Sequence, residues 1–237
     1  SVNAYLENTD DDVILNVLPL AFSYGLYQML LGFQVGARVV LERGFGFPAH
    51  TMALVEREGV TALPGVPTFF ALLLQFPTLL TRDFPSLRYI TNAAGPLPAS
   101  HIAQLRAAFP RAQFFSMYGQ TECKRISYLP PEQLDQRPTS VGVAIPNSEV
   151  YIVDEHGDRL PAGSVGELVV RGAHVMRGYW RAPEQTARRF RPGPVPGETV
   201  LYTGDLFRMD EDGYLYFVSR MDDIIKTRGE KVAPAEV

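Results

Sequence analysis

Between Val13 and Tyr118 the sequence alternates short apolar runs with longer amphipathic segments, and this alternation restricts the fold more than any other feature. The apolar runs, such as VILNVLPL and AQFFSMYG, are mostly apolar and do not alternate regularly with polar residues. Such strands are buried on both faces, which is typical of a parallel sheet covered by helices on each side. The sequence predicts strands over 13–20, 37–42, 60–66 and 112–119 and a strand with its following loop over 87–95. It predicts helices over 26–36, 48–59, 67–76 and 98–109.

Glycine, proline and serine mark the predicted helix boundaries. Gly36 and Gly59 follow two amphipathic segments, and glycine often ends a helix because it adopts a left-handed conformation at little cost. Pro67 stands near the start of a third segment, where its missing N–H removes no helical hydrogen bond. Ser100 is the expected N-cap of the fourth helix, because its hydroxyl can accept a bond from a free N–H.

The pattern changes after Lys124. The segments 148–172 and 201–220 each contain two alternating apolar runs joined by turn residues, which indicates antiparallel hairpins. Between them, Pro183 opens a short predicted helix.

The predicted fold is therefore of the α/β class, with a mostly parallel sheet flanked by helices, followed by an antiparallel, β-rich subdomain. The expected parts are an α/β subdomain over 1–124, a β-rich subdomain over 125–219 and a separate segment over 220–237.

Charge and cysteine content exclude several classes of function. The net charge of −4 does not predict binding to nucleic acid, which requires basic surface. A single cysteine, Cys123, forms no internal disulfide and fits the reducing cytoplasm, so a cytoplasmic location is expected. Four scattered histidines have no metal-ligand spacing. The apolar stretch 13–33 contains asparagine, proline and glutamine and changes period midway, so a strand followed by a helix is expected instead of a membrane span.

The segment SMYGQTECK, residues 116–124, follows the last predicted parallel strand. Open α/β sheets bind ligands at the carboxyl ends of their strands. There Gly119 would allow close approach of a ligand, Thr121 offers a hydroxyl to a phosphate, and Glu122 offers a hard oxygen ligand to Mg²⁺. An equally good interpretation is a strand that ends in a turn, with the threonine and glutamate as caps.

The segment LYTGDLF contains Asp205 directly after Gly204, which predicts a tight turn. An ionised carboxylate can accept two hydrogen bonds from the vicinal hydroxyls of a ribose. Taken alone, however, the pattern favours a turn aspartate bonded to its own backbone. The acidic residues 210–212 are expected to form only the tip of a hairpin.

The charged segment SRMDDIIKTRGEKVAPAEV, residues 219–237, has no helical charge spacing. A run of charges is usually a solvated face, but glycine and proline interrupt this one.

In order and spacing, six segments resemble the adenylate-forming superfamily, which contains acyl-CoA synthetases, aryl-CoA ligases, luciferases and the adenylation domains of peptide synthetases. They are NVLPLAFSYG (16–25), TNAAGPLP (91–98), MYGQTE (117–122), VGELVVRG (165–172), YTGD (202–205) and the segment 219–237. The resemblance covers essentially the whole chain, and it implies that the β-rich part is a distorted barrel.

The resemblance implies a role for each matching residue. Thr121 would contact phosphate, Glu122 would bind Mg²⁺, and Asp205 would hold the ribose with help from Arg220. The other nucleotide-binding candidates are Tyr118, which would stack on adenine, Gly119, and the adenine loop Ala93, Ala94, Gly95 and Pro96. The carboxylate pocket would contain Phe22, Ser23 and Tyr24. Asp222 falls at the position of a hinge, and Lys226, Arg228 and Gly229 would belong to a mobile lid.

The implied reaction has two steps. A carboxylic acid attacks the α-phosphate of ATP to give an acyl-adenylate and pyrophosphate, and a thiol of CoA, or of phosphopantetheine on an acyl carrier protein, then displaces AMP. Peptide-synthetase domains carry an aspartate where Ser23 stands, so an acyl or aryl acid is favoured over an α-amino acid. An amino-acid adenylation domain and a non-catalytic nucleotide-binding or interaction module remain the alternatives.

The resemblance also implies that this chain is a fragment of a protein about twice as long. The loop that holds the ATP β- and γ-phosphates would precede Ser1, and a catalytic lysine would follow Val237. The isolated segment is therefore expected to lack turnover. It is also expected to associate, as a homodimer or otherwise, through strand edges and apolar surface left uncovered.

Overall fold

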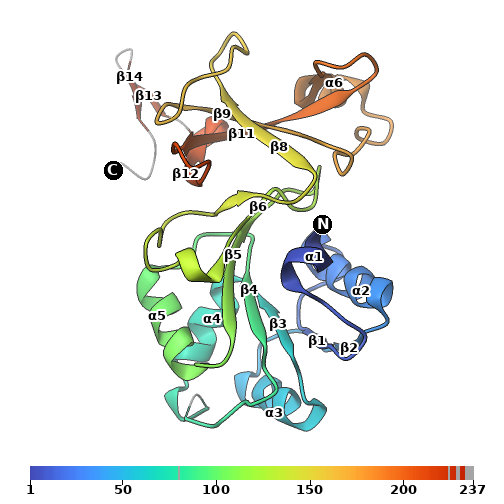
Figure 1. Cartoon of the computed structure of the whole chain (residues 1–237), viewed down its shortest axis with the longest axis vertical. Coiled ribbons are helices and arrows are strands. Elements are labelled where there is room, and N and C mark those ends of the chain that lie inside the picture. The colour runs from blue at the N-terminus through green and yellow to red at the C-terminus, as the bar shows by residue number, and fades with distance from the viewer. Residues whose placement is uncertain (80, 224, 228–229, 233–237) are drawn as a thin grey trace. The chain divides into compact units, whose positions relative to one another are not determined.

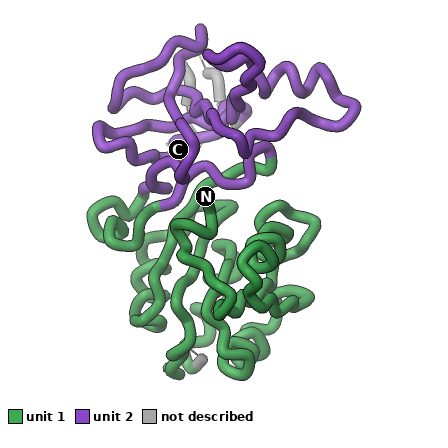
Figure 2. Tube along the Cα trace, turned by 45° about the vertical axis from the view of Figure 1, so that its right-hand side comes forward, with its two compact units in different colours: residues 1–121, 129–139 green, residues 122–128, 140–237 purple. Residues whose placement is uncertain are grey.

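The protein is described by a computed structural model over residues 1–79, 81–223, 225–227 and 230–232. It divides into two compact units, coloured separately in Figure 2. Unit 1 contains residues 1–121 and 129–139, and unit 2 contains 122–128 and 140–237. The division lies close to the change of sequence pattern at Lys124, but the subdomain boundaries expected from the sequence remain predictions.

Unit 1 contains five parallel strands in the order β2-β1-β3-β4-β5. Their bounds are β1 Val13–Asn16, β2 Arg38–Leu41, β3 Ala62–Gly65, β4 Tyr89–Asn92 and β5 Gln113–Tyr118. Every residue of β1, β3 and β4 is buried, as continuous apolar strands require when both faces are covered. The predicted parallel sheet is confirmed.

Helices lie on both sides of these strands. Figure 1 shows α4 and α5 on one side and α1 and α2 on the other. The helices are α1 Val2–Leu6, α2 Ser23–Val35, α3 Pro48–Glu58, α4 Pro67–Leu74 and α5 Ala99–Ala108, with 3₁₀ turns η1 Pro77–Leu79 and η2 Pro131–Gln133. The stretch 13–33 forms β1, a loop and α2. No helix among the described residues is long and apolar enough to cross a membrane.

Most of the predicted helix boundaries are confirmed. Gly36 and Gly59 follow α2 and α3 in the left-handed conformation, with φ of 79° and 64°. Pro67 begins α4, as predicted. The prediction for Ser100 is wrong, because α5 already begins at Ala99 after the cap residue Pro98, and Ser100 lies inside the first turn.

Unit 2 is built on an antiparallel sheet in the order β10-β11-β9-β8, with β12 paired to β11. Its strands are β8 Ser148–Val153, β9 Val165–Gly172, β10 Phe190–Pro192, β11 Thr199–Met209 and β12 Leu215–Arg220. The remaining elements are β6 Ser127–Leu129, β7 Val143–Ala144, α6 Pro183–Arg189, η3 Met221–Asp223, β13 Ile225–Thr227 and β14 Glu230–Val232. Both predicted hairpins and the helix after Pro183 are confirmed.

The tip of the second hairpin is organised by Asp210. Its Oδ1 accepts hydrogen bonds from the backbone N–H groups of Asp212 at 3.2 Å and Tyr214 at 2.8 Å. Gly213 adopts a φ of 82° in the same turn. The acidic residues 210–212 therefore form a hairpin tip, as predicted.

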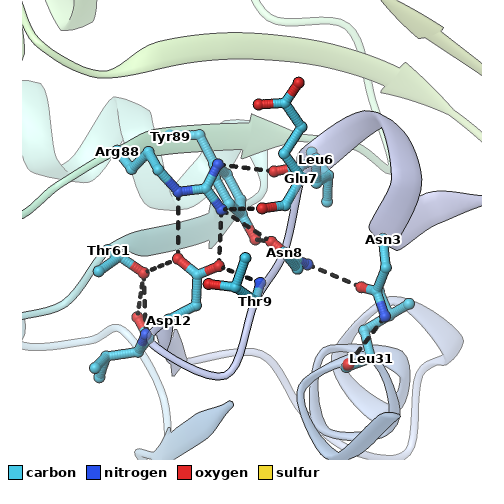
Figure 3. Close-up of polar contacts among 11 residues, drawn as sticks. Asn3, Leu6, Glu7, Asn8, Thr9, Asp12, Leu31, Thr61, Arg88 and Tyr89 are labelled. Carbon is cyan, nitrogen blue, oxygen red and sulfur yellow. Dashed lines mark hydrogen bonds and ion pairs between the residues drawn. The ribbon is translucent and has the colours of Figure 1, made fainter. Parts of the chain in front are cut away.

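A buried charge network joins the amino ends of β1, β3 and β4 (Figure 3). Asp12, which is 3% exposed, precedes β1 and accepts hydrogen bonds from Arg88 Nη2 at 2.8 Å and Thr61 Oγ1 at 2.6 Å. Thr61 precedes β3 and Arg88 precedes β4. Arg88 Nη1 also donates to the Leu6 carbonyl at the end of α1, at 2.8 Å. One carboxylate thus connects three neighbouring strands and the first helix.

The negative charge of Asp12 is stabilised by its hydrogen-bond partners although the side chain is buried. Burial by itself would raise the pKa of this carboxyl, but the hydrogen bonds from Arg88, Thr61 and the Thr9 backbone, with the charge of Arg88, lower the pKa below its ordinary value. Burial, reinforced by the negative charge of Asp12, raises the pKa of the neighbouring Tyr89. Tyr89 accordingly stays neutral and donates its hydroxyl to Asn8 Oδ1 at 2.9 Å.

We expect Asp12→Asn to lower the free energy of unfolding by about 2 kcal/mol, because it removes hydrogen bonds to a charged, buried acceptor. Urea denaturation at neutral pH measures this loss. Because the folded-state pKa is depressed, the stabilisation is present above the unfolded pKa of about 3.9 and is lost as pH falls through the folded value. The difference between the two proteins should therefore shrink in acid. Asp11→Asn, at an exposed neighbour, is the matched control, and an equal loss in both variants would contradict the prediction.

Candidate functional site

The candidate residues of unit 1 follow the carboxyl ends of neighbouring parallel strands. Residues 22–24 follow β1, residues 93–96 follow β4, and residues 119–121 follow β5. Parallel strands end at the same edge of a sheet, so these loops share one edge. The strand order also reverses at β1, which has β2 on one side and β3 on the other. Ligands of doubly wound sheets bind at such a reversal, outside the carboxyl ends of the strands.

The loop between β1 and α2 is held by Asn16. Its buried side chain donates to the Gly25 carbonyl at 3.1 Å and accepts the Leu18 N–H at 3.2 Å. Gly25 packs directly on the backbone of Pro19 and Leu18, and an added Cβ would lie 2.8 Å from the Leu18 oxygen and closer still to that of Pro19. The sequence placed both residues in the pocket segment but gave no sign that they shape it.

The three pocket candidates lie at the start of α2. Phe22 is the N-cap residue and is 68% exposed, and Ser23, which is half-buried, is the first helical residue. The Tyr24 hydroxyl donates to the Thr91 carbonyl at 3.0 Å and lies 2.7 Å from Thr91 Oγ1. Thr91 belongs to β4, so Tyr24 joins the predicted pocket to the strand that leads into the predicted adenine loop.

The adenine-loop candidates, residues 93–96, adopt an unusual backbone. Ala94 has a φ of 71°, a conformation that is uncommon for any residue other than glycine and that concentrates at functional sites. Asn92 Nδ2 donates to the Gly95 carbonyl at 3.0 Å and holds the loop. Ala93 is buried, whereas Ala94 and Pro96 are exposed and available to a ligand.

The segment at the end of β5 is half-buried from Tyr118 to Gln120 and becomes exposed at Thr121. Tyr118, the last residue of β5, is half-buried, and Gln120 Nε2 donates to its hydroxyl at 3.1 Å. Gly119 is half-buried and Thr121 is exposed. The role of Gln120 in orienting Tyr118 was not predicted from the sequence.

Glu122 belongs to unit 2, where two groups contact it. Its Oε1 accepts a hydrogen bond of 2.5 Å from the Tyr179 hydroxyl, and its backbone carbonyl accepts the Met176 N–H at 2.8 Å. Burial, followed by the hydrogen bond to Glu122 and the charge of that carboxylate, raises the pKa of Tyr179 to about 12. Tyr179 therefore acts as a neutral donor. It was not predicted as a site residue, since its partner lies 57 residues away.

Two basic residues, Lys124 and Arg125, follow Glu122 after one intervening cysteine. Burial, assisted by the charge of Arg125, lowers the pKa of Lys124 to about 7. Lys124 also has a positive φ of 62°, and Arg125 is 3% exposed. Residues 122–125 therefore combine one carboxylate with a half-buried amine and a buried guanidinium, which the sequence analysis did not recognise.

Asp205 and Arg220 lie opposite each other on β11 and β12, as their predicted shared role requires. The Asp205 side chain is 4% exposed, and its Oδ1 lies 3.7 Å from Arg220 Nε. The predicted tight turn is wrong, because Gly204 and Asp205 lie inside β11. The pairing of β11 with β9 is irregular between Tyr202 and Leu206, and Gly204 has a φ of 70°, which produces a bulge that resembles a turn in sequence.

The hinge and lid candidates are only partly described. Asp222 is exposed in η3, with Oδ2 at 4.0 Å from Arg189 Nη2. Lys226 lies in β13, and Arg228 and Gly229 lie outside the described residues.

The acidic residues suit a metal ion that is bound mainly by the phosphate oxygens of a nucleotide. In the described part of the chain, no group of three or more histidine, cysteine, aspartate or glutamate side chains could hold a metal by itself. Mg²⁺ in nucleotide enzymes is commonly bound by one or two carboxylates together with phosphate oxygens and water. A single carboxylate at Glu122 fits that arrangement.

Comparison with protein families identifies the family to which the chain belongs. A family model described as "AMP-binding enzyme" matches residues 1–180. The chain belongs to this family. Its fold, with a mainly parallel sheet flanked by helices and an antiparallel sheet, agrees with that of solved family relatives.

Several known proteins resemble the chain along most of its length. It is 34% identical to 4-coumarate--CoA ligase 2 of Nicotiana tabacum over 99% of the chain and 43% of the relative. O-succinylbenzoate coenzyme A synthetase (MenE) from Bacillus subtilis, in complex with ATP and magnesium, matches with a TM-score of 0.88 and 30% identity over 100% of this chain and 47% of that one. VinN in complex with L-aspartate matches with a TM-score of 0.78 and 40% identity over 92% of this chain and 52% of that one. The chain thus spans about half the length of these relatives.

We expect Gly25→Ala to disturb the loop that leads into the pocket candidates. Its Cβ would meet backbone atoms, which cannot rotate away, and overpacking of this kind costs about 1–3 kcal/mol. Urea denaturation should show this loss, although alanine is the better helix former. Gly44→Ala is the matched control, since an added Cβ there meets no atom within 4 Å. Equal stability of the two variants would refute the tight contact.

Proposed function

We propose that this chain is part of an AMP-forming carboxylate ligase that activates an acyl or aryl acid with ATP and transfers it to a thiol. The family match over residues 1–180 carries the proposal. It is supported by the arrangement of the candidate residues at the carboxyl edge of the parallel sheet and around Glu122 and Asp205.

In the proposed first step, the substrate carboxylate attacks the α-phosphorus of ATP, and the bond to the pyrophosphate oxygen breaks. Both reactants are anions, so fixed donors and cations must neutralise the growing charge in an organised site. Thr121 would donate its hydroxyl to phosphate, and Tyr118 would stack on adenine. Asp205, with Arg220, would hold the ribose hydroxyls. Mg²⁺ held by Glu122 would supply positive charge at the phosphates.

In the proposed second step, a thiolate attacks the acyl carbonyl and AMP leaves. CoA and a phosphopantetheine carrier offer the same thiol, and the names of the ligase relatives favour CoA. Asp222 would serve as the hinge that brings Lys226, Arg228 and Gly229 to the site. The cytoplasmic location expected from the single cysteine also remains a prediction.

The substrate class is proposed from the start of α2. Ser23 carries no charge to pair with an α-ammonium group, whereas Phe22 and Tyr24 supply apolar surface. An aryl or acyl acid fits these side chains. The similarity to VinN, which was solved in complex with L-aspartate, favours a second candidate, the adenylation of an amino acid.

Pyrophosphate exchange with the intact protein tests these alternatives. The panel would contain aryl acids, fatty acids and amino acids, each with ATP and Mg²⁺. We expect exchange with an aryl or acyl acid. Exchange with amino acids alone would favour the second candidate. Failure of every acid would favour a non-catalytic module, which binds nucleotide if ATP still binds and is an interaction module if it does not.

We expect Asp205→Asn in the intact protein to weaken ATP binding by about tenfold or more, because a hydrogen bond to a charged group contributes about 1.5–3 kcal/mol. Isothermal calorimetry measures the affinity. Asp212→Asn, which makes the same change at the exposed hairpin tip, should bind ATP as the wild type does. Unchanged affinity in the Asp205 variant would exclude its role at the ribose.

A further inference from the structure

One segment of unit 2 contacts Glu122 at two points. The Tyr179 hydroxyl donates to Glu122 Oε1 at 2.5 Å, and the Met176 N–H donates to the Glu122 carbonyl at 2.8 Å. The first contact fixes the carboxylate, and the second fixes the backbone that carries it. Both come from residues 176–189, a stretch that the proposed reaction has not used.

Tyr179 is itself held firmly in place. Its backbone N–H donates to Thr186 Oγ1 at 2.9 Å, and that hydroxyl donates to the Ala182 carbonyl at 2.9 Å. Its ring packs edge-on against Phe190, with centroids 5.8 Å apart. Gly178 has a φ of 140°, and an added Cβ there would lie 2.5 Å from Thr186 Cγ2. The phenol therefore has little freedom to leave Glu122.

The same segment reaches the bulge that carries Asp205. Arg189, the last residue of α6, donates from Nη1 to the Thr203 carbonyl at 2.5 Å, and its guanidinium packs against Gly204. The helix α6 and the residues before it thus contact Glu122 at one end and the backbone next to Asp205 at the other. These contacts all lie within unit 2.

We propose that Tyr179 is a positioning residue for Glu122, and that its hydroxyl orients the carboxylate toward Mg²⁺. This inference rests on the proposed function. A carboxylate has two oxygens, so a phenol bound to Oε1 leaves Oε2 available for the metal and limits rotation of the group. Loss of a partner that orients a metal ligand typically weakens metal binding by about 10–100-fold.

Tyr179→Phe in the intact protein tests this inference, because it removes the hydroxyl and keeps the ring against Phe190. Calorimetry would measure ATP binding with Mg²⁺ and with EDTA. We expect affinity for ATP with Mg²⁺ to fall by about tenfold and affinity without the metal to stay unchanged. Tyr216→Phe is the matched control, because its hydroxyl donates to the Asp210 carboxylate at 3.1 Å and makes no contribution to the proposed site.

A double-mutant cycle with Glu122→Gln separates positioning from a general structural effect. If Tyr179 acts through the Glu122 carboxylate, Tyr179→Phe should cause little further loss in the Glu122→Gln background. Additive losses, or an equal loss with and without Mg²⁺, would overturn the inference and leave the proposed function standing. A wild-type protein that binds no ATP under either condition would overturn both.

Discussion

The buried carboxylate of Asp12 joins the amino ends of three parallel strands in unit 1. Parallel strands are joined by long crossovers and not by tight turns, so no local turn sets their register. Asp12 binds Thr61 and Arg88, which directly precede β3 and β4, and Arg88 also binds the end of α1. This network sets the amino ends of three strands. The candidate pocket and adenine loop follow the carboxyl ends of β1 and β4, at the opposite edge of the sheet.

The candidate residues of unit 2 come from distant positions along the chain, so long-range contacts must bring them into place. Asp205 faces Arg220 through strand pairing, and Gly204 provides the bulge beside it. Glu122 is held by Tyr179, from a segment that ends on Arg189 and the backbone of Thr203. A short helix and its preceding loop therefore connect a proposed metal ligand with a proposed ribose ligand. In both units the groups that orient the candidate residues are buried or half-buried, as preorganised polar sites require.

The predictions succeeded where one short stretch decides the structure. Continuous apolar runs identified the buried strands, and Gly36 and Gly59 marked helix ends because their left-handed conformations are local properties. The predictions failed where another segment of the chain decides the local structure. Ser100 had the right chemistry for a cap, but the helix had already begun one residue earlier. Gly204 and Asp205 have the composition of a turn, and pairing with β9 and β12 on either side makes them part of a strand.

By itself, the sequence determined the parallel sheet, the later hairpins, and a family whose motifs name Thr121, Glu122, Asp205 and their neighbours. These follow from periodicity and from short segments that can be read one at a time. Tertiary structure alone decided which hydrogen bonds hold the candidate segments in place. They are Asn16 to Gly25, Tyr24 to Thr91, and Tyr179 to Glu122. The last two of these contacts join residues 67 and 57 positions apart, so no local pattern records them and only the folded chain brings the partners within hydrogen-bond distance.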